Sequence, residues 1–177
     1  MLVMAAASDA HRQHGAAPST DGPLTTSPSG TFRGSWMTTR KGQRIEAYRG
    51  VRYAEPPVGE LRFKPPRLIT QYKDVVDATQ EGPACPQPVQ NDYPVDEDCL
   101  RLNVYTHGHK GKLLPVIMYM HAGGFYSVSG RSDVAGPDYL LDRDVVLVTI
   151  NYRLGSLGFL STGDEQAPGN NGFKDQV

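Results

Sequence analysis

The chain has 177 residues, of which 38% are apolar, and its formal net charge is -1. This length is sufficient to bury the core of one globular domain. Because 18 Lys and Arg face 19 Asp and Glu, no basic excess favours nucleic acid or an anionic membrane surface as a partner. The sequence also contains no run close to the roughly 20 apolar residues of a membrane span. We therefore expect small neutral substrates or protein partners.

Residues 1–26 are expected to form a flexible leader, because small and polar residues dominate the region and apolar periodicity is absent. Residues 1–7 are apolar, but no charged region precedes them and polar residues follow directly. They therefore do not clearly form a signal peptide. The remaining residues, 27–177, are expected to belong to a single domain.

The first elements of this domain are predicted to be antiparallel strands. Strand-like runs at 31–39 and 44–48 lie on either side of a polar turn at 40–43, a pattern that predicts a hairpin. The prolines at 53–59 and 64–66 forbid regular helix and central strand, so these segments are expected to be extended coil.

Further strands are predicted at 100–105, 113–120 and 145–151. The last two runs are almost continuously apolar, which is typical of strands buried on both faces of a mostly parallel sheet. A helix is predicted at 136–143, with a proline near its start, so a strand, a helix and a strand form a crossover unit. Together with the earlier antiparallel strands, this unit predicts a mixed sheet. Another helix is predicted to begin at residue 172.

The tetrapeptide His121-Ala122-Gly123-Gly124 directly follows the predicted strand at 113–120. A glycine pair at the end of a core strand can direct two backbone N–H groups towards one point and stabilise a developing oxyanion. HGGG-type runs supply part of the oxyanion hole in lipases and esterases. A plain glycine turn is the alternative. The chain contains no G-x-S-x-G, and its nearest approach, GRSDV at 130–134, lacks the last glycine. We therefore expect an oxyanion hole without its nucleophile.

Five blocks of the sequence, in order, resemble the type-B carboxylesterase family, which includes cholinesterases and insect juvenile-hormone esterases. The blocks are YRGVRYAEPPVGELRF at 48–63, EDCLRLNVY at 97–105, the tetrapeptide at 121–124, NYRLG and GFL within 151–160, and APGNNGFKDQ at 167–176. The resemblance covers about residues 27–177. It implies an α/β fold of the α/β-hydrolase type, of which the chain is the N-terminal part. Its mixed, mostly parallel sheet is then incomplete and ends before the nucleophile elbow.

The resemblance implies a serine carboxylesterase that hydrolyses carboxylic esters through an acyl-enzyme, with a small ester as its substrate and no cofactor. Gly123 and Gly124 are then oxyanion-hole donors. Phe125 and Tyr126 either line the substrate pocket or pack in the core. Ala122 replaces a glycine common in the family, and its methyl group is strained only where φ is positive. This replacement motivates an alternative, in which the parent is a non-catalytic cholinesterase-like adhesion protein that keeps the fold and loses triad residues.

The resemblance also implies roles for residues away from the glycine pair. Cys85 and Cys99 match the first disulfide of the family, which indicates an oxidising compartment and a secreted protein. Two free buried thiols are the alternative. A metal site is not expected, because no Cys/His cluster has metal-ligand spacing. Arg62 and Glu97 match a structural ion pair. Arg153 matches an arginine whose partner is expected beyond the end of the chain, so we expect it to be unpaired.

The histidines are not expected to act as a general base. His121 lies directly before the glycine pair, whereas the catalytic histidine of the family lies far towards the C-terminus. It is expected to fix the loop by hydrogen bonding. His107 and His109 lie in a turn rich in Gly and Lys and are expected to be solvated.

Overall fold

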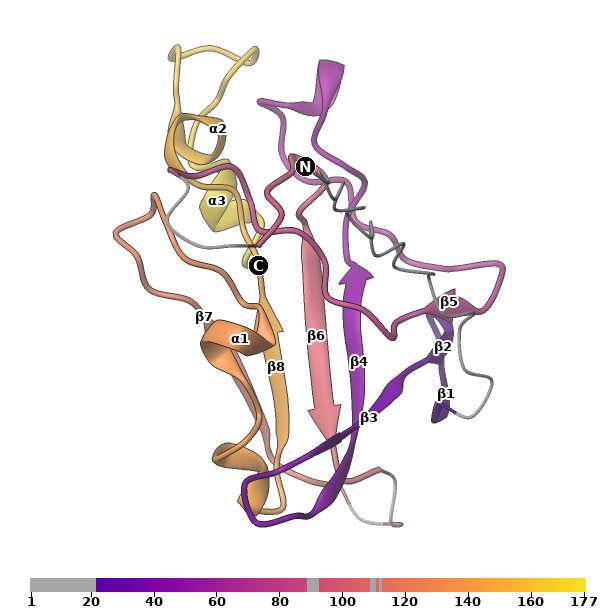
Figure 1. The fold of residues 1–177 in the computed structure, drawn as a ribbon. Coiled ribbons are helices and arrows are strands. Elements are labelled where there is room, and N and C mark those ends of the chain that lie inside the picture. The colour runs from indigo at the N-terminus through magenta and orange to yellow at the C-terminus, as the bar shows by residue number, and fades with distance from the viewer. Residues whose placement is uncertain (1–21, 89–92, 109–110, 112) are drawn as a thin grey trace, which may run out of the picture.

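The computed structural model of the chain describes residues 22–88, 93–108, 111 and 113–177. Its strands form a three-stranded sheet and a five-stranded sheet, and short helices lie at the ends and edges of the larger sheet (Figure 1). The strands are β1 (Leu24–Ser27), β2 (Gly30–Arg33), β3 (Ser35–Thr38), β4 (Arg44–Arg52), β5 (Val76–Asp77), β6 (Arg101–Thr106), β7 (Val116–Met120) and β8 (Val146–Ile150). The helices are α1 (Ser132–Ala135), α2 (Gly155–Phe159) and α3 (Asn171–Lys174), with 3-10 turns η1 (Gly59–Leu61) and η2 (Leu140–Asp142).

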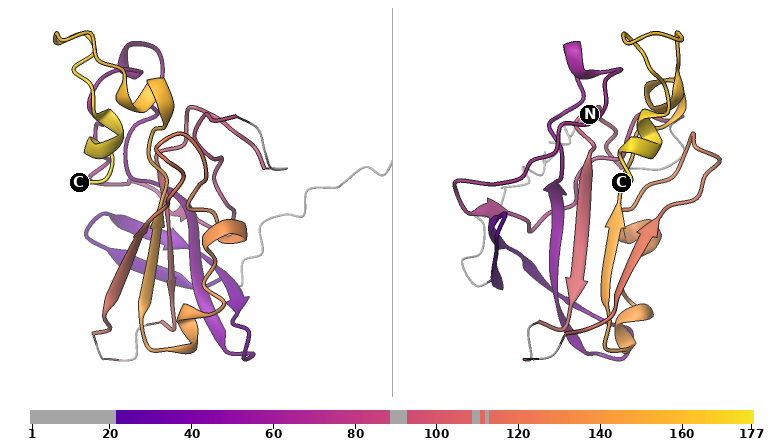
Figure 2. Two further views of the ribbon diagram at one scale, coloured as in Figure 1. Left: turned by 90° about the vertical axis from the view of Figure 1, so that its left-hand side faces the viewer. Right: turned by 180° about the vertical axis from the view of Figure 1, so that it is seen from behind.

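The larger sheet has the strand order β3-β4-β6-β8-β7. The pairs from β3 to β8 are antiparallel, and β7 pairs with β8 in parallel. The predicted hairpin, the crossover between β7 and β8 and the mixed sheet are therefore confirmed. Because β7 and β8 are parallel, their carboxyl ends meet at one edge of the sheet, and α2 and α3 lie beyond that edge in both views of Figure 2.

The smaller sheet, of order β1-β2-β5, was not predicted. The run at 31–39 is divided at Gly34 into β2 and β3, which belong to different sheets. A Cβ at Gly34 would lie 2.6 Å from the carbonyl oxygen of Ala47 and 2.8 Å from the Tyr48 ring, so the backbone crosses β4 where only glycine fits. Within the described residues, β1 lies largely inside the predicted leader, so ordered structure begins before residue 27. The rest of the leader, 1–21, lies outside the described residues.

The predicted helix at 136–143 is wrong. Gly136 is extended, with ψ 162°, and ends α1 directly before Pro137, because a residue that precedes proline is disfavoured in the α region. Only η2 forms within the predicted range. The helix at the C-terminus is confirmed as α3, and the proline-rich segments are coil apart from η1.

All five residues of β7 are 38–64% exposed. The strand is therefore not buried on both faces, as its apolar run alone would favour, but it lacks cover, as we expect for an incomplete sheet. It lies at the edge of the sheet, whereas Leu147 and Ile150 of β8 are almost fully buried. The core lies instead around β4, β6 and β8, and one buried cluster joins Leu100, Tyr152 and Leu154 to the disulfide between Cys85 and Cys99. None of the helices in the described part of the chain is long and apolar enough to cross a membrane.

Candidate functional site

The segment 121–128, called the glycine loop below, leaves the carboxyl end of β7. Gly123 has φ 118° and Gly124 has φ 60°, both in the region that favours glycine. A Cβ at Gly123 would lie 2.1 Å from the carbonyl oxygen of Ser127. The carbonyl oxygen of Gly123 accepts the N–H groups of Tyr126 at 3.1 Å and of Ser127 at 3.2 Å. The loop is therefore a tight turn that tolerates no side chain at Gly123.

The two glycine N–H groups are available as donors. No acceptor among the described residues takes the N–H of Gly123 or Gly124, while Gly123 is half-buried and Gly124 is exposed. Unpaired backbone donors are uncommon in folded proteins unless water or a ligand satisfies them. Two successive free donors at the end of a strand can therefore hydrogen-bond a negatively charged oxygen.

Ala122 does not strain this arrangement. It is not one of the described non-glycine residues with positive φ, and its side chain is exposed. A methyl group at this position would strain the loop only if φ were positive. Ala122 is therefore compatible with the conformation of the glycine pair.

Contacts of His121 hold the start of the glycine loop in place. The residue is almost fully buried, its ring stacks on Tyr152 with 4.4 Å between centroids, and its Nδ1 lies 2.8 Å from the carbonyl oxygen of Ala122. The Tyr152 hydroxyl donates to the carbonyl oxygen of His121 at 2.8 Å. Burial lowers the pKa of His121 below its ordinary value, against an opposing effect of the hydrogen bond to Ala122. These contacts support the expected role of fixing the loop.

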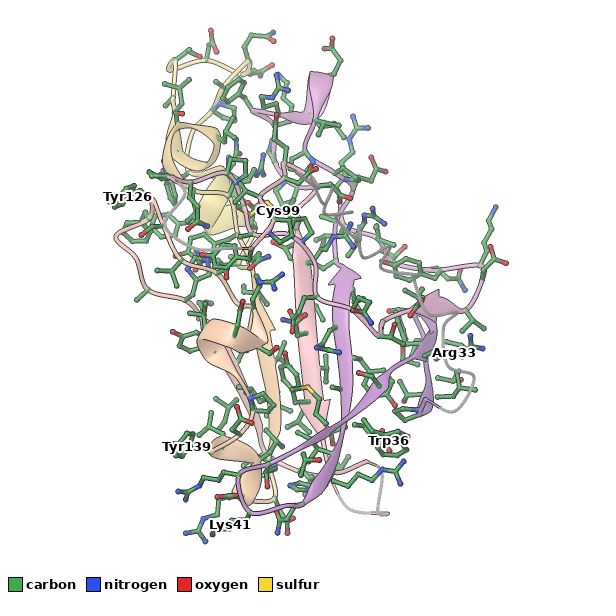
Figure 3. All side chains as sticks on the ribbon, in the orientation of Figure 1. Arg33, Trp36, Lys41, Cys99, Tyr126 and Tyr139 are labelled. Atoms are coloured by element: carbon green, nitrogen blue, oxygen red, sulfur yellow. A yellow bond between two sulfur atoms is a disulfide. The ribbon has the colours of Figure 1, made fainter. Side chains whose placement is uncertain are left out.

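Phe125 and Tyr126 lie at the tip of the loop, and each is about half exposed. The Phe125 ring packs edge-on against Phe159 of α2 and Phe173 of α3, with 5.3 Å between centroids in each case. Its backbone has φ 65°, and its carbonyl oxygen accepts the N–H of Gly155 at 2.8 Å. Tyr126 lies beside the upper part of the sheet in Figure 3. Phe125 thus joins an aromatic cluster and still presents an open face.

The expected partners around the site are partly confirmed. Arg62 donates to Glu97 through Nε at 2.6 Å and Nη2 at 2.9 Å, but the side chains are 41% and 29% exposed, so this ion pair is not buried. His107 is not simply solvated, because its Nε2 lies 2.7 Å from the carbonyl oxygen of Leu141. His109 lies outside the described residues.

The expectation for Arg153 is wrong. Its guanidinium pairs with Asp175 at 2.6 Å, and both side chains are at most 2% exposed. Its Nη1 also donates to the carbonyl oxygens of Arg62 and Lys64. Sequence reasoning missed this partner, although the acidic residue lies within the block APGNNGFKDQ.

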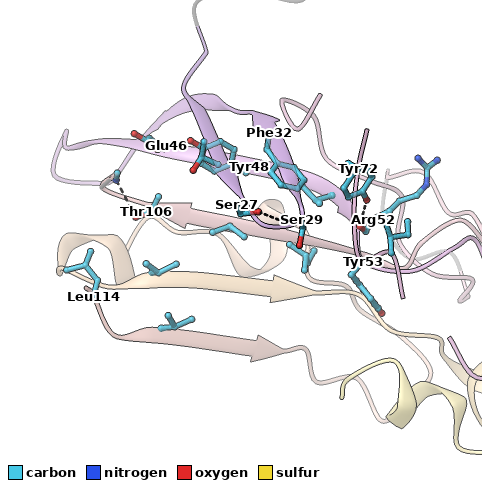
Figure 4. A pocket seen from close by; sticks show the side chains of 18 of the residues that line it. Ser27, Ser29, Phe32, Glu46, Tyr48, Arg52, Tyr53, Tyr72, Thr106 and Leu114 are labelled. Atoms are coloured by element: carbon cyan, nitrogen blue, oxygen red, sulfur yellow. Dashed lines mark hydrogen bonds between the residues drawn. The ribbon is translucent and has the colours of Figure 1, made fainter. Parts of the chain in front are cut away.

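A separate hollow lies away from the glycine loop. About 570 Å³ of space separates the smaller sheet from one face of the larger sheet, with Phe32, Tyr48, Val51 and Leu102 among its mostly apolar lining (Figure 4). No residue of the glycine loop lines it. Since the surface of this hollow is mostly apolar and does not include the free N–H donors, we place the candidate site at the glycine loop. Among the described residues, no group of three His, Cys, Asp or Glu side chains could hold a metal ion.

Comparison with known proteins gives consistent results. A sequence model described as the carboxylesterase family matches residues 21–177. A juvenile hormone esterase from Tribolium castaneum is 44% identical over 163 residues, which is 88% of this chain and 27% of that protein. Esterase FE4 from Myzus persicae is 45% identical over 158 residues, or 84% of this chain and 28% of that protein.

A solved structure shares the fold. The crystal structure of juvenile hormone esterase from Manduca sexta, with OTFP covalently attached, superposes with a TM-score of 0.80 at 36% identity and covers 88% of this chain and 31% of that one. This likeness confirms the expected α/β-hydrolase fold. The chain spans less than a third of the length of these relatives.

Proposed function

Because the chain belongs to the carboxylesterase family, we propose that it is the N-terminal portion of a serine esterase that hydrolyses small carboxylic esters. The glycine loop is the oxyanion hole of this enzyme. The observation that carries the proposal is the pair of free N–H donors at Gly123 and Gly124, held in a turn that excludes a Cβ at the first of them.

The chemistry follows from where negative charge develops. When a nucleophile attacks an ester carbonyl, the carbonyl oxygen becomes an anion in the tetrahedral intermediate. Donors fixed in advance stabilise this anion more than the neutral ester, and therefore lower the barrier. One such donor contributes on the order of 10²–10³ in kcat. The buried His121 and Tyr152 hold the start of the loop, so little reorganisation is needed when the charge appears.

The remaining catalytic groups are assigned to the part of the protein that the longer relatives have and this chain does not cover. In this proposal a serine attacks the ester and forms an acyl-enzyme, while a histidine, oriented by Glu or Asp, accepts the serine proton and water then cleaves the acyl group. Phe125 and Tyr126 contact the substrate through their open faces. The disulfide between Cys85 and Cys99 supports a secreted protein, because such bonds persist in oxidising compartments.

One experiment distinguishes the esterase from the alternative, a non-catalytic adhesion protein. The complete protein is incubated with 4-nitrophenyl acetate, with and without the serine-directed reagent diisopropyl fluorophosphate. If the protein is an esterase, it should hydrolyse 4-nitrophenyl acetate, and this activity should disappear as the reagent attaches one phosphoryl group per chain. Absence of both turnover and labelling, with cell-surface binding that the reagent does not change, would favour the adhesion protein.

A further inference from the structure

Val128, the last residue of the glycine loop, has an unfavourable backbone conformation. Its φ is 79°, in the left-handed region that a β-branched residue rarely adopts. Such a conformation costs on the order of 1–3 kcal/mol and persists only where the surroundings impose it. A contact that holds Val128 in place is therefore required.

The side chain of Gln87 provides this contact. Its Oε1 accepts the N–H of Val128 at 2.7 Å, and its Nε2 donates to the carbonyl oxygen of Val128 at 2.8 Å. The carboxamide thus pairs with both backbone groups of one residue, as a peptide group does in a sheet. Among the described side chains outside the loop, Gln87 alone hydrogen-bonds the backbone of residues 122–128.

Gln87 is itself fixed by the disulfide. It follows Cys85 by two residues, and its Nε2 also donates to the carbonyl oxygen of Cys85 at 3.1 Å. Cys85 is 99% buried and bonded to Cys99. A short path therefore connects the disulfide to the far end of the glycine loop.

The position of Val128 affects the glycine pair. Ser127 precedes it and donates to the carbonyl oxygen of Gly123 through both its N–H and its hydroxyl. If Val128 relaxed to a negative φ, Ser127 would turn and these bonds to Gly123 would be disturbed. The peptide plane that carries the Gly124 N–H would then change its direction.

We propose that Gln87 is a positioning residue for the oxyanion hole: by holding Val128 in the left-handed conformation, it aims the N–H group of Gly124 in the glycine pair. This role rests on the proposed esterase function. Gln87 touches neither the substrate nor the reacting atoms. It acts through Val128, and the disulfide gives it a fixed support.

The test compares Gln87→Ala, Gln87→Ala/Val128→Gly and the control Gln43→Ala in the complete protein. Gln43 is exposed and lies in the turn before β4, two residues after Lys41, which Figure 3 labels at the end of the sheet away from Tyr126. With 4-nitrophenyl acetate, Gln87→Ala should lower kcat by about 10-fold to 100-fold, because a small misplacement of a catalytic group has effects of this size. KM should change by less than about twofold, since ground-state binding is not altered.

The double variant provides the more specific readout. Glycine adopts a positive φ without the Cβ penalty, so Val128→Gly should restore part of the lost kcat. Gln43→Ala should match the wild type. An unchanged kcat in Gln87→Ala, or a loss that Val128→Gly does not relieve, would overturn the proposal.

Hydrogen exchange separates this proposal from the esterase function. In Gln87→Ala, amides of residues 123–128 should exchange faster than in the wild type, while those of β4 and β6 keep their rates. Uniformly faster exchange along the chain would make Gln87 a general stability residue and refute the positioning role. If exchange in Gln87→Ala is faster only at residues 123–128, but the wild-type protein does not turn over the ester, the esterase function alone is refuted.

Discussion

The guanidinium of Arg153, just after β8, pairs with the carboxylate of Asp175, just after α3, at 2.6 Å and with both side chains almost fully buried. The same carboxylate accepts the backbone N–H of Arg153 at 3.0 Å. Through the carbonyl oxygens of Arg62 and Lys64, Arg153 also reaches the proline-rich coil. One residue thus joins the edge of the sheet, the last helix and the coil that lies beside it.

Asp175→Ala should destabilise the complete protein by about 3–5 kcal/mol, because it leaves a buried guanidinium without its counter-charge. The free energy of unfolding in urea measures this loss. Glu55→Ala serves as the matched control, since Glu55 and Arg67 are 3.9 Å apart and 52% and 67% exposed, and exposed pairs contribute at most about 1 kcal/mol. Equal effects of the two substitutions would refute the importance of the buried pair.

The partner of Arg153 could not be predicted from the sequence. Asp175 lies 22 residues away, and the contact forms because α3 folds back against the segment after β8. The spacing of Arg153 and Asp175 in the sequence does not predict this tertiary contact. The family pattern gave the arginine correctly, but its partner was expected beyond the end of the chain.

Other features could be predicted from the sequence because the patterns that indicate them are local. Apolar runs located β6, β7 and β8 within a few residues, and the turn at 40–43 located the β3–β4 hairpin. Gly136 followed by proline indicates only that residue 136 is not helical; the shortening of the predicted helix to η2 could not be predicted from this pair. The exposure of β7 followed from the incomplete sheet that the family resemblance implied, and not from periodicity, which describes the strand and not what covers it. The Gln87 contact could not be predicted, since the conformation of Val128 has no signature in the sequence.

Replacement of both cysteines by serine should lower the free energy of unfolding by about 3 kcal/mol, because the bond closes a loop of roughly 15 residues in the unfolded chain. Cys85 and Cys99 are 14 residues apart and both are buried. Urea unfolding of the double variant beside the wild type checks this value. Addition of a reductant should destabilise the wild type and leave the double variant unchanged; an equal response of both would contradict the assignment.

His121 should make stability depend on pH. Burial holds its pKa in the folded protein below the ordinary value of 6.5, so between these two pKa values the unfolded chain binds more protons. The free energy of unfolding should therefore fall as the pH drops through about 6.5. His121→Phe keeps an aromatic ring and removes the titration, so its stability should depend less on pH.

Tyr152→Phe is the control for this measurement. It removes the hydroxyl that bonds the carbonyl oxygen of His121, with a loss of about 0.5–1.5 kcal/mol, but keeps the ring that stacks on the imidazole. Its stability should retain the pH dependence of the wild type. Identical slopes for the wild type and His121→Phe between pH 5 and 7 would count against the buried, neutral imidazole.

The 177-residue chain expressed alone should aggregate through β7, an edge strand with five exposed apolar residues. Met118→Lys should reduce light scattering, because a charge on an edge strand opposes further pairing. Leu113→Lys is the control, since Leu113 is 91% exposed but precedes the strand. A monodisperse monomer of the unaltered chain would contradict this prediction.

The most direct test is the kcat of the complete protein for 4-nitrophenyl acetate in the wild type, Gly123→Ala and Ala122→Gly. A methyl group at Gly123 meets the Ser127 carbonyl and should displace both donors, whereas Ala122 lacks a positive φ. Near-ultraviolet circular dichroism verifies that each variant is folded. We expect a loss in kcat of about 10²-fold or more for Gly123→Ala and little change for Ala122→Gly. A folded Gly123→Ala variant with wild-type kcat would show that the glycine loop is not the oxyanion hole.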